Sequence, residues 1–187
     1  MHPVAEAINT VLIAGTAFLI IGGKSMKRTY KVRKMEKHCR PILKELSKSD
    51  SKWKLKKINR DVRDTFYIMS EAWTKMDQNI AIDYSTENLY NTHQSKLQWM
   101  KIRNERNIIK MPKLLTSKVF QAATLSDNTD TILVYIRGFM IDYIETNGYI
   151  TEGNSIIPTT YIEYWKFNYE NGRWVLDEII QPDSYNL

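Results

Sequence analysis

The hydrophobic pattern changes its period near Asn107, and this change restricts the folded part of the chain to helices followed by strands. Before it, apolar residues recur at spacings of 4, 4, 3, 4 and 3, which places them on one face of a helix. These residues are Ile58, Val62, Phe66, Met69, Trp73 and Met76. A second predicted helix, Thr86 to Arg103, carries Leu89, His93, Leu97 and Met100 on one side.

After Asn107, segments rich in β-branched and aromatic residues predict four long antiparallel strands. The first two are Lys113 to Leu125 and Thr131 to Glu145, with a turn at 126–130 between them. Gly138 predicts a bulge or bend in the second strand. Residues 146–158 are predicted to form a loop, and Asn171-Gly172 predicts a tight hairpin turn between the last two strands. The fold class is therefore α+β, with helices packed on a curved four-stranded antiparallel sheet.

Alternation assigns the two faces of this last hairpin. Trp165, Phe167 and Tyr169 share a side with Tyr161 and Glu163 in the first arm. In the second arm, Trp174, Leu176 and Ile180 share a side with Glu178, and Val175 and Ile179 share the other with Asp177. Large apolar groups on both faces predict that the hairpin is covered on one side and partly covered on the other. It is expected to brace the sheet, with one face available to line a cavity.

The N-terminal segment Val4 to Gly23 predicts a membrane span. Its only charge is Glu6, and a helix of its length rises about 30 Å, enough to cross a hydrocarbon core. The expected lipid-facing residues are Val4, Val11, Leu12, Ile13, Phe18, Leu19, Ile20 and Ile21. An interfacial or core helix and a cleaved signal are the alternatives, although no cation precedes the apolar run as a signal would require.

The cations of the chain are concentrated after this segment. Lys24 to Lys57 holds 14 Lys/Arg against 3 acids, a net of +11, whereas Ile58 to Leu187 has a net of −4. The juxtamembrane set is Lys24, Lys27, Arg28, Lys31, Arg33, Lys34, Lys37 and Arg40. By the positive-inside rule it predicts a single-pass cell-membrane protein with a cytoplasmic C-terminal domain. The same cluster suits anionic lipid headgroups, and the alternatives are that it is only solvated or that it binds RNA phosphate. The acidic body argues against a nucleic-acid-binding face on the main domain, so a nucleic-acid partner is not expected.

These patterns divide the chain into an anchor at 1–23, a basic helical connector at 24–57 and an α+β domain at 58–187. Pro41 is expected to interrupt the helix of the connector. Cys39 is the only cysteine, which excludes a disulfide within the chain and a Cys-based zinc site. The three histidines lie in unrelated segments, so no metal is expected, and His93 is expected to be buried and hydrogen-bonded.

No phosphate-binding glycine loop, paired metal histidines or nucleophile elbow is present in the sequence. Among the strand carboxylates, Asp142 is the best candidate for a general base, although an exposed strand acid is the simpler interpretation. We therefore expect a protein that is not an enzyme and uses no cofactor.

Several segments, in this order, resemble the Tim-forty-four-like domain of the mitochondrial import-motor anchor and its membrane-tethered bacterial relatives. They are "VRDTFYIMSEAWTKMD", "DYSTENLY", "LQWMKIRNERNIIKMPKLL" and "EYWKF…GRWVLDEIIQPD", within Ile58 to Asp183. The resemblance implies a cone-like fold of the nuclear-transport-factor-two type with an apolar cavity. The candidate lining residues are Phe66, Trp73, Phe139, Trp165 and Trp174.

Three functions are compatible with the sequence. The first is a membrane-anchored scaffold or adaptor for an unknown protein partner, linked by the resemblance to protein translocation. The second is a cone that binds a small ligand or lipid or acts as an isomerase, which requires an ionisable residue such as Asp142 or Asp177 to face the cavity. The third is a secretion or conjugation component of the same fold, which would place the domain outside the membrane.

Overall fold

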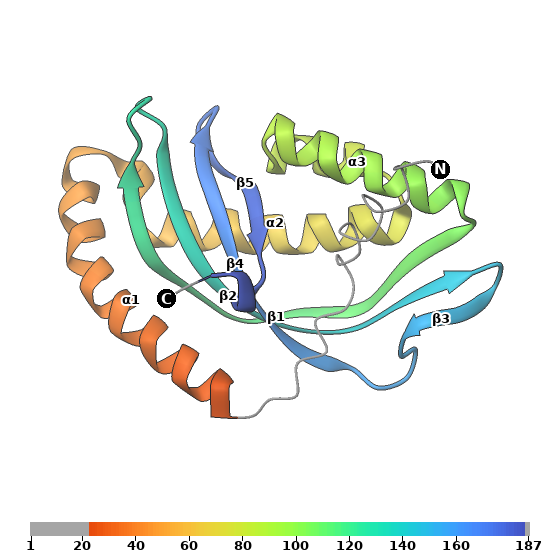
Figure 1. Ribbon diagram of the computed structural model, residues 1–187. Helices are drawn as coiled ribbons and strands as arrows, with labels where there is room; N and C mark the ends of the chain where they lie inside the picture. Colours follow the sequence, from red (N-terminus) through yellow and green to blue (C-terminus); the bar gives the residue numbers. More distant parts are fainter. Residues whose placement is uncertain (1–22, 186–187) are drawn as a thin grey trace, which may run out of the picture.

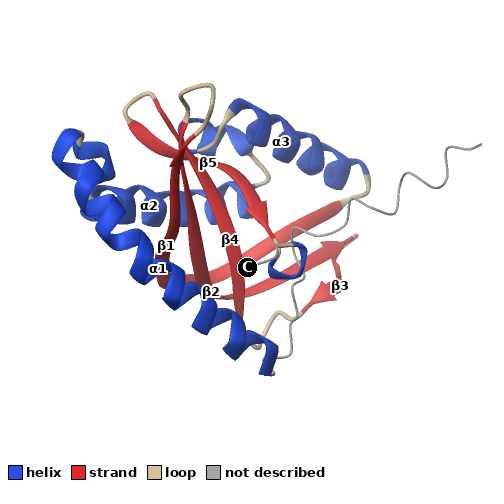
Figure 2. Ribbon diagram, turned by 60° about the vertical axis from the view of Figure 1, so that its left-hand side comes forward, coloured by secondary structure: helices blue, strands red, loops and turns tan. Residues whose placement is uncertain are grey.

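A computed structural model describes residues 23–185 of the chain as helices followed by a curved antiparallel sheet (Figure 1). The α-helices are α1 (Gly23–Ser49), α2 (Leu55–Lys75) and α3 (Glu87–Ile102). The strands are β1 (Glu105–Thr124), β2 (Asp130–Thr146), β3 (Tyr149–Gly153), β4 (Thr159–Glu170) and β5 (Arg173–Ile180). Short 3₁₀ turns are η1 (Ser51–Trp53), η2 (Gln78–Tyr84) and η3 (Pro182–Ser184). The α+β prediction is confirmed, and α2 lies within the curve of the sheet (Figures 1 and 2).

The two predicted amphipathic helices are confirmed. All six residues of the first apolar stripe are buried, from Ile58 near the start of α2 to Met76, which ends it in a left-handed conformation. In α3 the four predicted inward residues are also buried. Thr86 caps α3, because its hydroxyl accepts a hydrogen bond from the Leu89 amide at 3.4 Å.

The sheet has the order β1-β2-β4-β5, and β3 pairs with the end of β2. The prediction that residues 146–158 form a loop is wrong in part, because β3 turns back on β2 after a turn at Asn147-Gly148. The sheet therefore has five strands instead of four. β1 also begins at Glu105, eight residues before the predicted strand, and its register slips between Lys110 and Lys113.

The structure has no bulge on β2 at Gly138. The pairing of β2 with β4 runs through it without a shift, and the irregularity lies on β1, between Leu114 and Thr116. A side chain at Gly138 would meet the Tyr161 ring, since a Cβ there would lie 2.3 Å from Tyr161 Cζ. The glycine leaves room for this ring from the neighbouring strand.

Helix α1 packs against the domain. The prediction that Pro41 interrupts it is wrong, since α1 continues through that residue to Ser49. Its buried stripe consists of Val32, Glu36, Cys39 and Leu43, one helical face at spacings of 4, 3 and 4. Val32 joins Phe120, Tyr135 and Tyr164 in one buried cluster, and Leu43 joins the main core around α2. An ion pair of 2.6 Å between Glu36 and Lys118 ties α1 to β1.

The β4–β5 hairpin has apolar groups on both faces, as predicted. Phe167, Trp174 and Leu176 enter the main core, while Tyr164 and Ile180 belong to the cluster beneath α1. The predicted sides of Ile179 and Ile180 are exchanged, because Lys166 pairs with Glu178 and Phe167 with Leu176. This bulge leaves Asp177 unmatched and reverses the alternation after it.

Within residues 23–185 no helix is both long and apolar enough to cross a membrane. The predicted span residues, Val4, Val11, Leu12, Ile13, Phe18, Leu19, Ile20 and Ile21, all lie outside the described residues.

Candidate functional site

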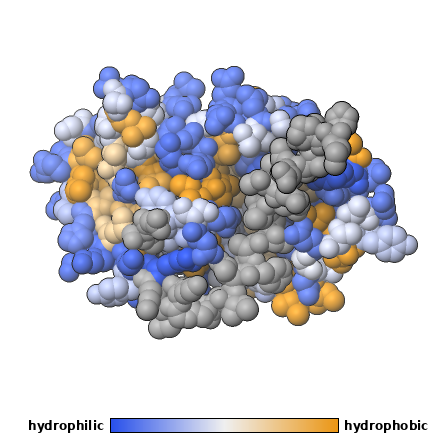
Figure 3. All heavy atoms as spheres, in the orientation of Figure 1, coloured by the Kyte–Doolittle hydropathy of each residue, from blue (hydrophilic) through white to orange (hydrophobic). Residues whose placement is uncertain are grey.

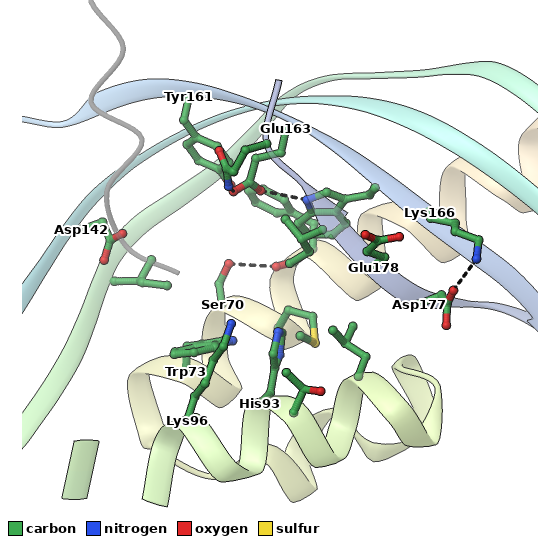
Figure 4. Close-up of a pocket in the computed structure, with 18 of the residues that line it drawn as sticks. Ser70, Trp73, His93, Lys96, Asp142, Tyr161, Glu163, Lys166, Asp177 and Glu178 are labelled. Carbon is green, nitrogen blue, oxygen red and sulfur yellow. Dashed lines mark hydrogen bonds and ion pairs between the residues drawn. The ribbon is translucent and has the colours of Figure 1, made fainter. Parts of the chain in front are cut away.

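A cavity of about 600 Å³ lies between the inner face of the sheet and helices α2 and α3 (Figure 4). Its sheet wall is formed by residues of β1, β2, β4 and β5, and its helical wall by one face each of α2 and α3. Phe66, Trp73 and Trp165 supply aromatic surface, and Phe66 stacks on Trp165 with ring centroids 6.0 Å apart. A cavity of this volume is in the range of small-molecule sites.

The sheet wall carries two carboxyl groups close to a tyrosine. Glu163 accepts hydrogen bonds from Trp165 Nε1 at 2.8 Å and from Gln181 Nε2 at 3.2 Å. Burial raises the pKa of Glu163, and these two hydrogen bonds oppose the rise. Tyr161 lies next to Glu163 over Gly138, and its burial raises the pKa of its phenol well above the usual range (Figure 4).

Asp142 projects into the same cavity from β2. Asn107 Nδ2 donates a hydrogen bond of 2.7 Å to its Oδ1. Burial raises the pKa of Asp142 to about 6, the Asn107 hydrogen bond opposes this rise, and the charges of Glu163 and Glu152 add to it. The simpler interpretation of Asp142 as an exposed strand acid is therefore wrong, because the residue lines a cavity in which ionisation is disfavoured.

The helical wall contributes His93 and Lys96 from α3 (Figure 4). His93 is 3% exposed and packs edge-on against Trp73 with centroids 5.1 Å apart. It is buried as predicted but its Nδ1 has no hydrogen-bond partner among the described residues, contrary to the expectation of a hydrogen-bonded ring. Burial, together with the Lys96 charge, lowers the pKa of His93 to about 4, and burial lowers the pKa of Lys96.

Asp177, the other carboxylate considered for the cavity, is paired. It accepts a hydrogen bond from Thr86 at 3.0 Å and forms an ion pair of 2.8 Å with Lys166. By contrast, neither Asp142 nor Glu163 has a cationic partner among residues 23–185. Glu178 also lines the cavity without an ion pair, but it is exposed to solvent. Asp142 and Glu163 are therefore the less exposed carboxyls of the sheet wall whose charge a ligand would have to balance.

Three of the five residues predicted to line the cavity do so, and two do not. Phe66, Trp73 and Trp165 line the cavity. Trp174 is fully buried beside Trp53, and its indole N–H donates to the Lys52 carbonyl at 3.0 Å. Phe139 is half-buried and falls between Gly138 and Met140, out of phase with the inward residues of β2.

Tyr161, Glu163 and Lys96 were not proposed as site residues from the sequence. Alternation along the fourth strand does put Tyr161 and Glu163 on the side of Trp165, so the signal for both existed. The spacing also places Lys96 beside His93, since residues three apart are neighbours on a helix surface. Its position was concealed by its type, because a lysine is usually solvated.

The basic set is distributed along α1. Lys24 and Lys27 belong to its first turns, and Arg28 is ion-paired with Asp183. Arg40 pairs with Glu36 at 2.8 Å. The remaining members are exposed: Lys31, Arg33, Lys34 and Lys37. Figure 3 shows hydrophilic residues along the left edge of the molecule, where α1 lies.

Cysteine and metal chemistry have little support in the described part of the chain. Cys39 is buried, and its burial raises the pKa of its thiol to about 11, which keeps it protonated and unreactive. Residues 23–185 contain no group of three His, Cys, Asp or Glu side chains arranged to hold a metal ion.

No protein-family model matches the chain, and no curated protein is similar to it in sequence. Several solved structures align with its fold. The intermembrane space region of the chloroplast protein ARC6 is 11% identical with a TM-score of 0.48, over 64% of this chain and 89% of that one. A protein named as the transfer protein TraH of the Gram-positive conjugative plasmid pIP501 is 12% identical with a TM-score of 0.32, over 67% and 94%.

A protein named as a polyketide cyclase of Xanthomonas campestris pv. campestris is 10% identical with a TM-score of 0.31, over 64% of this chain and 90% of that one. At such identities and scores these likenesses assign neither a family nor an activity, so the function has to be argued from the cavity and from α1.

Proposed function

We propose that this chain is a domain held at a membrane that binds a small ligand in its cavity. The observation that carries the proposal is the pair of cavity carboxyls, Asp142 and Glu163, that have only neutral hydrogen-bond donors. A buried charge without a counter-charge is costly, and burial raises the pKa of both groups. Such an arrangement is more easily explained as a site for a ligand than as part of a packed core.

Detection of a ligand that stays bound to the protein during purification would test this proposal directly. The full chain, extracted in a mild uncharged detergent, is examined by native mass spectrometry for a bound small molecule. Thr159→Trp should fill the cavity, which Thr159 lines, and remove the additional mass. Thr151→Trp is the matched control, because Thr151 lies on β3 and is exposed. Equal ligand content in both variants would contradict binding in this cavity.

The location at a membrane is part of the proposal and is supported by the sequence of Val4 to Gly23 and the cations that follow it. A single span would leave the C-terminal domain in the cytoplasm. In intact cells the C-terminus should then resist external protease, and high salt should not release the chain. Salt release would contradict a spanning segment, and external digestion would contradict the orientation and favour a secretion or conjugation role.

The second candidate is the scaffold that the Tim-forty-four-like resemblance implies, with α1 against anionic lipid and an unknown protein partner. It is favoured by the exposed side of α1, where Arg33, Lys37 and Lys44 recur at spacings of 4 and 7. Because α1 packs on the sheet, lipid contact along it would fix how the domain stands on the membrane. Each cation close to an anionic membrane surface contributes roughly 1 kcal/mol to the binding free energy.

A fluorophore at Lys34→Cys tests this contact in reconstituted vesicles, since Cys39 is buried and should not react. Anionic lipid should shift its emission, while the same label at Glu71→Cys on α2 should not respond. An unchanged Lys34→Cys signal would contradict lipid contact, and a shift on added RNA that exceeds the lipid effect would favour nucleic acid instead.

A further inference from the structure

The cavity has two chemically different ends, which restricts the kind of ligand it can hold. Asp142, Tyr161 and Glu163 gather on the sheet side, and His93 and Lys96 stand on the α3 side (Figure 4). The surface between them contains several apolar and aromatic side chains. It includes Phe66, Met69, Trp73, Met140 and Trp165.

At the sheet end the carboxyl groups are oriented but not neutralised. Asn107 holds Asp142, while Trp165 and Gln181 hold Glu163, so every donor to these two groups is uncharged. The nearby Lys166 is already paired with Asp177 at 2.8 Å. An ammonium group would supply both the missing charge and several N–H donors.

At the helical end, His93 and Lys96 favour a ligand group that accepts hydrogen bonds. His93 is almost completely buried, yet its Nδ1 lacks a partner among residues 23–185. Lys96 forms no ion pair with any described side chain and also faces the cavity. A carboxylate or phosphate oxygen would accept from the Lys96 ammonium and from an imidazole N–H of His93.

We propose that the cavity binds an amphipathic zwitterion. Its ammonium lies between Asp142 and Glu163, its apolar spacer lies along the aromatic wall, and its anionic group meets Lys96 and His93. This inference rests on the proposed function, because it names the class of ligand for the same cavity. The spacer is needed because the two charged ends belong to opposite walls of the cavity.

Four six-carbon probes separate the contributions of the two ends. They are 6-aminohexanoate, hexylamine, hexanoate and hexan-1-ol, titrated calorimetrically into the full chain in a maltoside detergent with a detergent blank. Hexylamine should bind about tenfold or more tightly than hexan-1-ol, since a hydrogen bond to a charged group contributes about 1.5–3 kcal/mol. The zwitterion should bind more tightly still. Hexanoate should bind more weakly than the zwitterion, because its carboxylate can meet Lys96 and His93 but its apolar end leaves the two carboxyls without an ammonium.

Two substitutions assign the ends. Glu163→Gln keeps an acceptor for Trp165 but removes the charge, so it should weaken hexylamine about tenfold and leave hexan-1-ol unchanged. Lys96→Met should reduce 6-aminohexanoate to the affinity of hexylamine. Glu71→Gln is the control, because it removes a negative charge on α2 outside the cavity and should change neither value.

The outcomes distinguish this inference from the proposed function. If hexan-1-ol binds as tightly as hexylamine, or if Glu163→Gln leaves hexylamine unaffected, the cavity binds ligands but does not recognise an ammonium, and the zwitterion is wrong. If 6-aminohexanoate gains nothing over hexylamine, the anionic end is wrong. If none of the four probes binds, the zwitterion is wrong. The small-ligand function fails separately, if native mass spectrometry finds equal ligand content in Thr159→Trp and Thr151→Trp.

Discussion

Replacing Asp142 by asparagine should stabilise the protein at neutral pH. The ionised carboxylate is disfavoured because burial raises its pKa from 3.8 to about 6. That difference is about two units, and each unit corresponds to 1.36 kcal/mol, so ionisation at pH 7 costs about 3 kcal/mol of folding free energy. Asp142→Asn has nearly the same size, and its amide oxygen can still accept the 2.7 Å hydrogen bond from Asn107. We expect a gain of roughly 2–3 kcal/mol in unfolding free energy.

The stability gain of Asp142→Asn should depend on pH, and the raised pKa determines the direction of that dependence. A carboxyl with a raised pKa binds its proton more strongly in the folded chain, so stability is greatest below the unfolded pKa and falls as pH rises towards 6. The advantage of Asp142→Asn should therefore be largest near pH 7.5 and nearly vanish near pH 4. His93 acts oppositely in an overlapping range, because its pKa is lowered to about 4 and protonation favours unfolding. The comparison must accordingly be made between variants at equal pH.

Urea unfolding of the full chain in uncharged detergent, followed by tryptophan fluorescence, measures both quantities. Glu71→Gln serves as the reference, since Glu71 is exposed on α2 and pairs with Lys75 at 2.6 Å. It should shift stability by less than about 1 kcal/mol. If Asp142→Asn destabilises the chain at pH 7.5, or if its effect is the same at both pH values, the carboxylate is not an uncompensated buried charge and the reasoning about the cavity fails.

The remaining predictions concern the packing that positions the cavity. Leu43→Ala should cost about 2–5 kcal/mol of unfolding free energy because Leu43 is buried between α1 and the main core, whereas Ile42→Ala, at an exposed neighbour, should change it by less than about 0.5 kcal/mol. Equal effects would show that α1 does not pack on the domain in solution. Gly138→Ala should destabilise the chain by about 1–3 kcal/mol through the Tyr161 ring, and Tyr161→Ala should relieve most of this in a double-mutant cycle measured by urea unfolding. Purely additive effects would exclude the ring as the cause.

The existence and type of helices α2 and α3 and of strands β2, β4 and β5 were predictable because their apolar residues follow a helical or a strand period over most of each element. The stripe from Ile58 to Met76 and the alternation of Trp165 with Phe167 fixed both the element type and the inward face. The short strand β3 was not predictable in this way. Its residues are mostly exposed and it is held chiefly by pairing with β2, so no burial pattern marks it.

The cavity itself was less accessible to sequence reasoning, because its polar residues come together only through tertiary packing. Asp142, Glu163 and His93 belong to three separate elements, and nothing local in the chain indicates that they share one space. The bulge at Asp177 also depends on the partner strand, which reverses the sides of Ile179 and Ile180. The apolar stripe of α1 was also missed, because the many charged residues of this helix made the whole segment read as solvated.

The packing of α1 bears on how the two proposals fit together. On β4, Tyr164 faces the cluster that holds Val32 of α1, while its neighbours Glu163 and Trp165 face the cavity. One strand therefore contributes to the cluster beneath α1 on one face and to the proposed ammonium site on the other. If α1 is docked on a membrane, the cavity takes a fixed orientation to that surface.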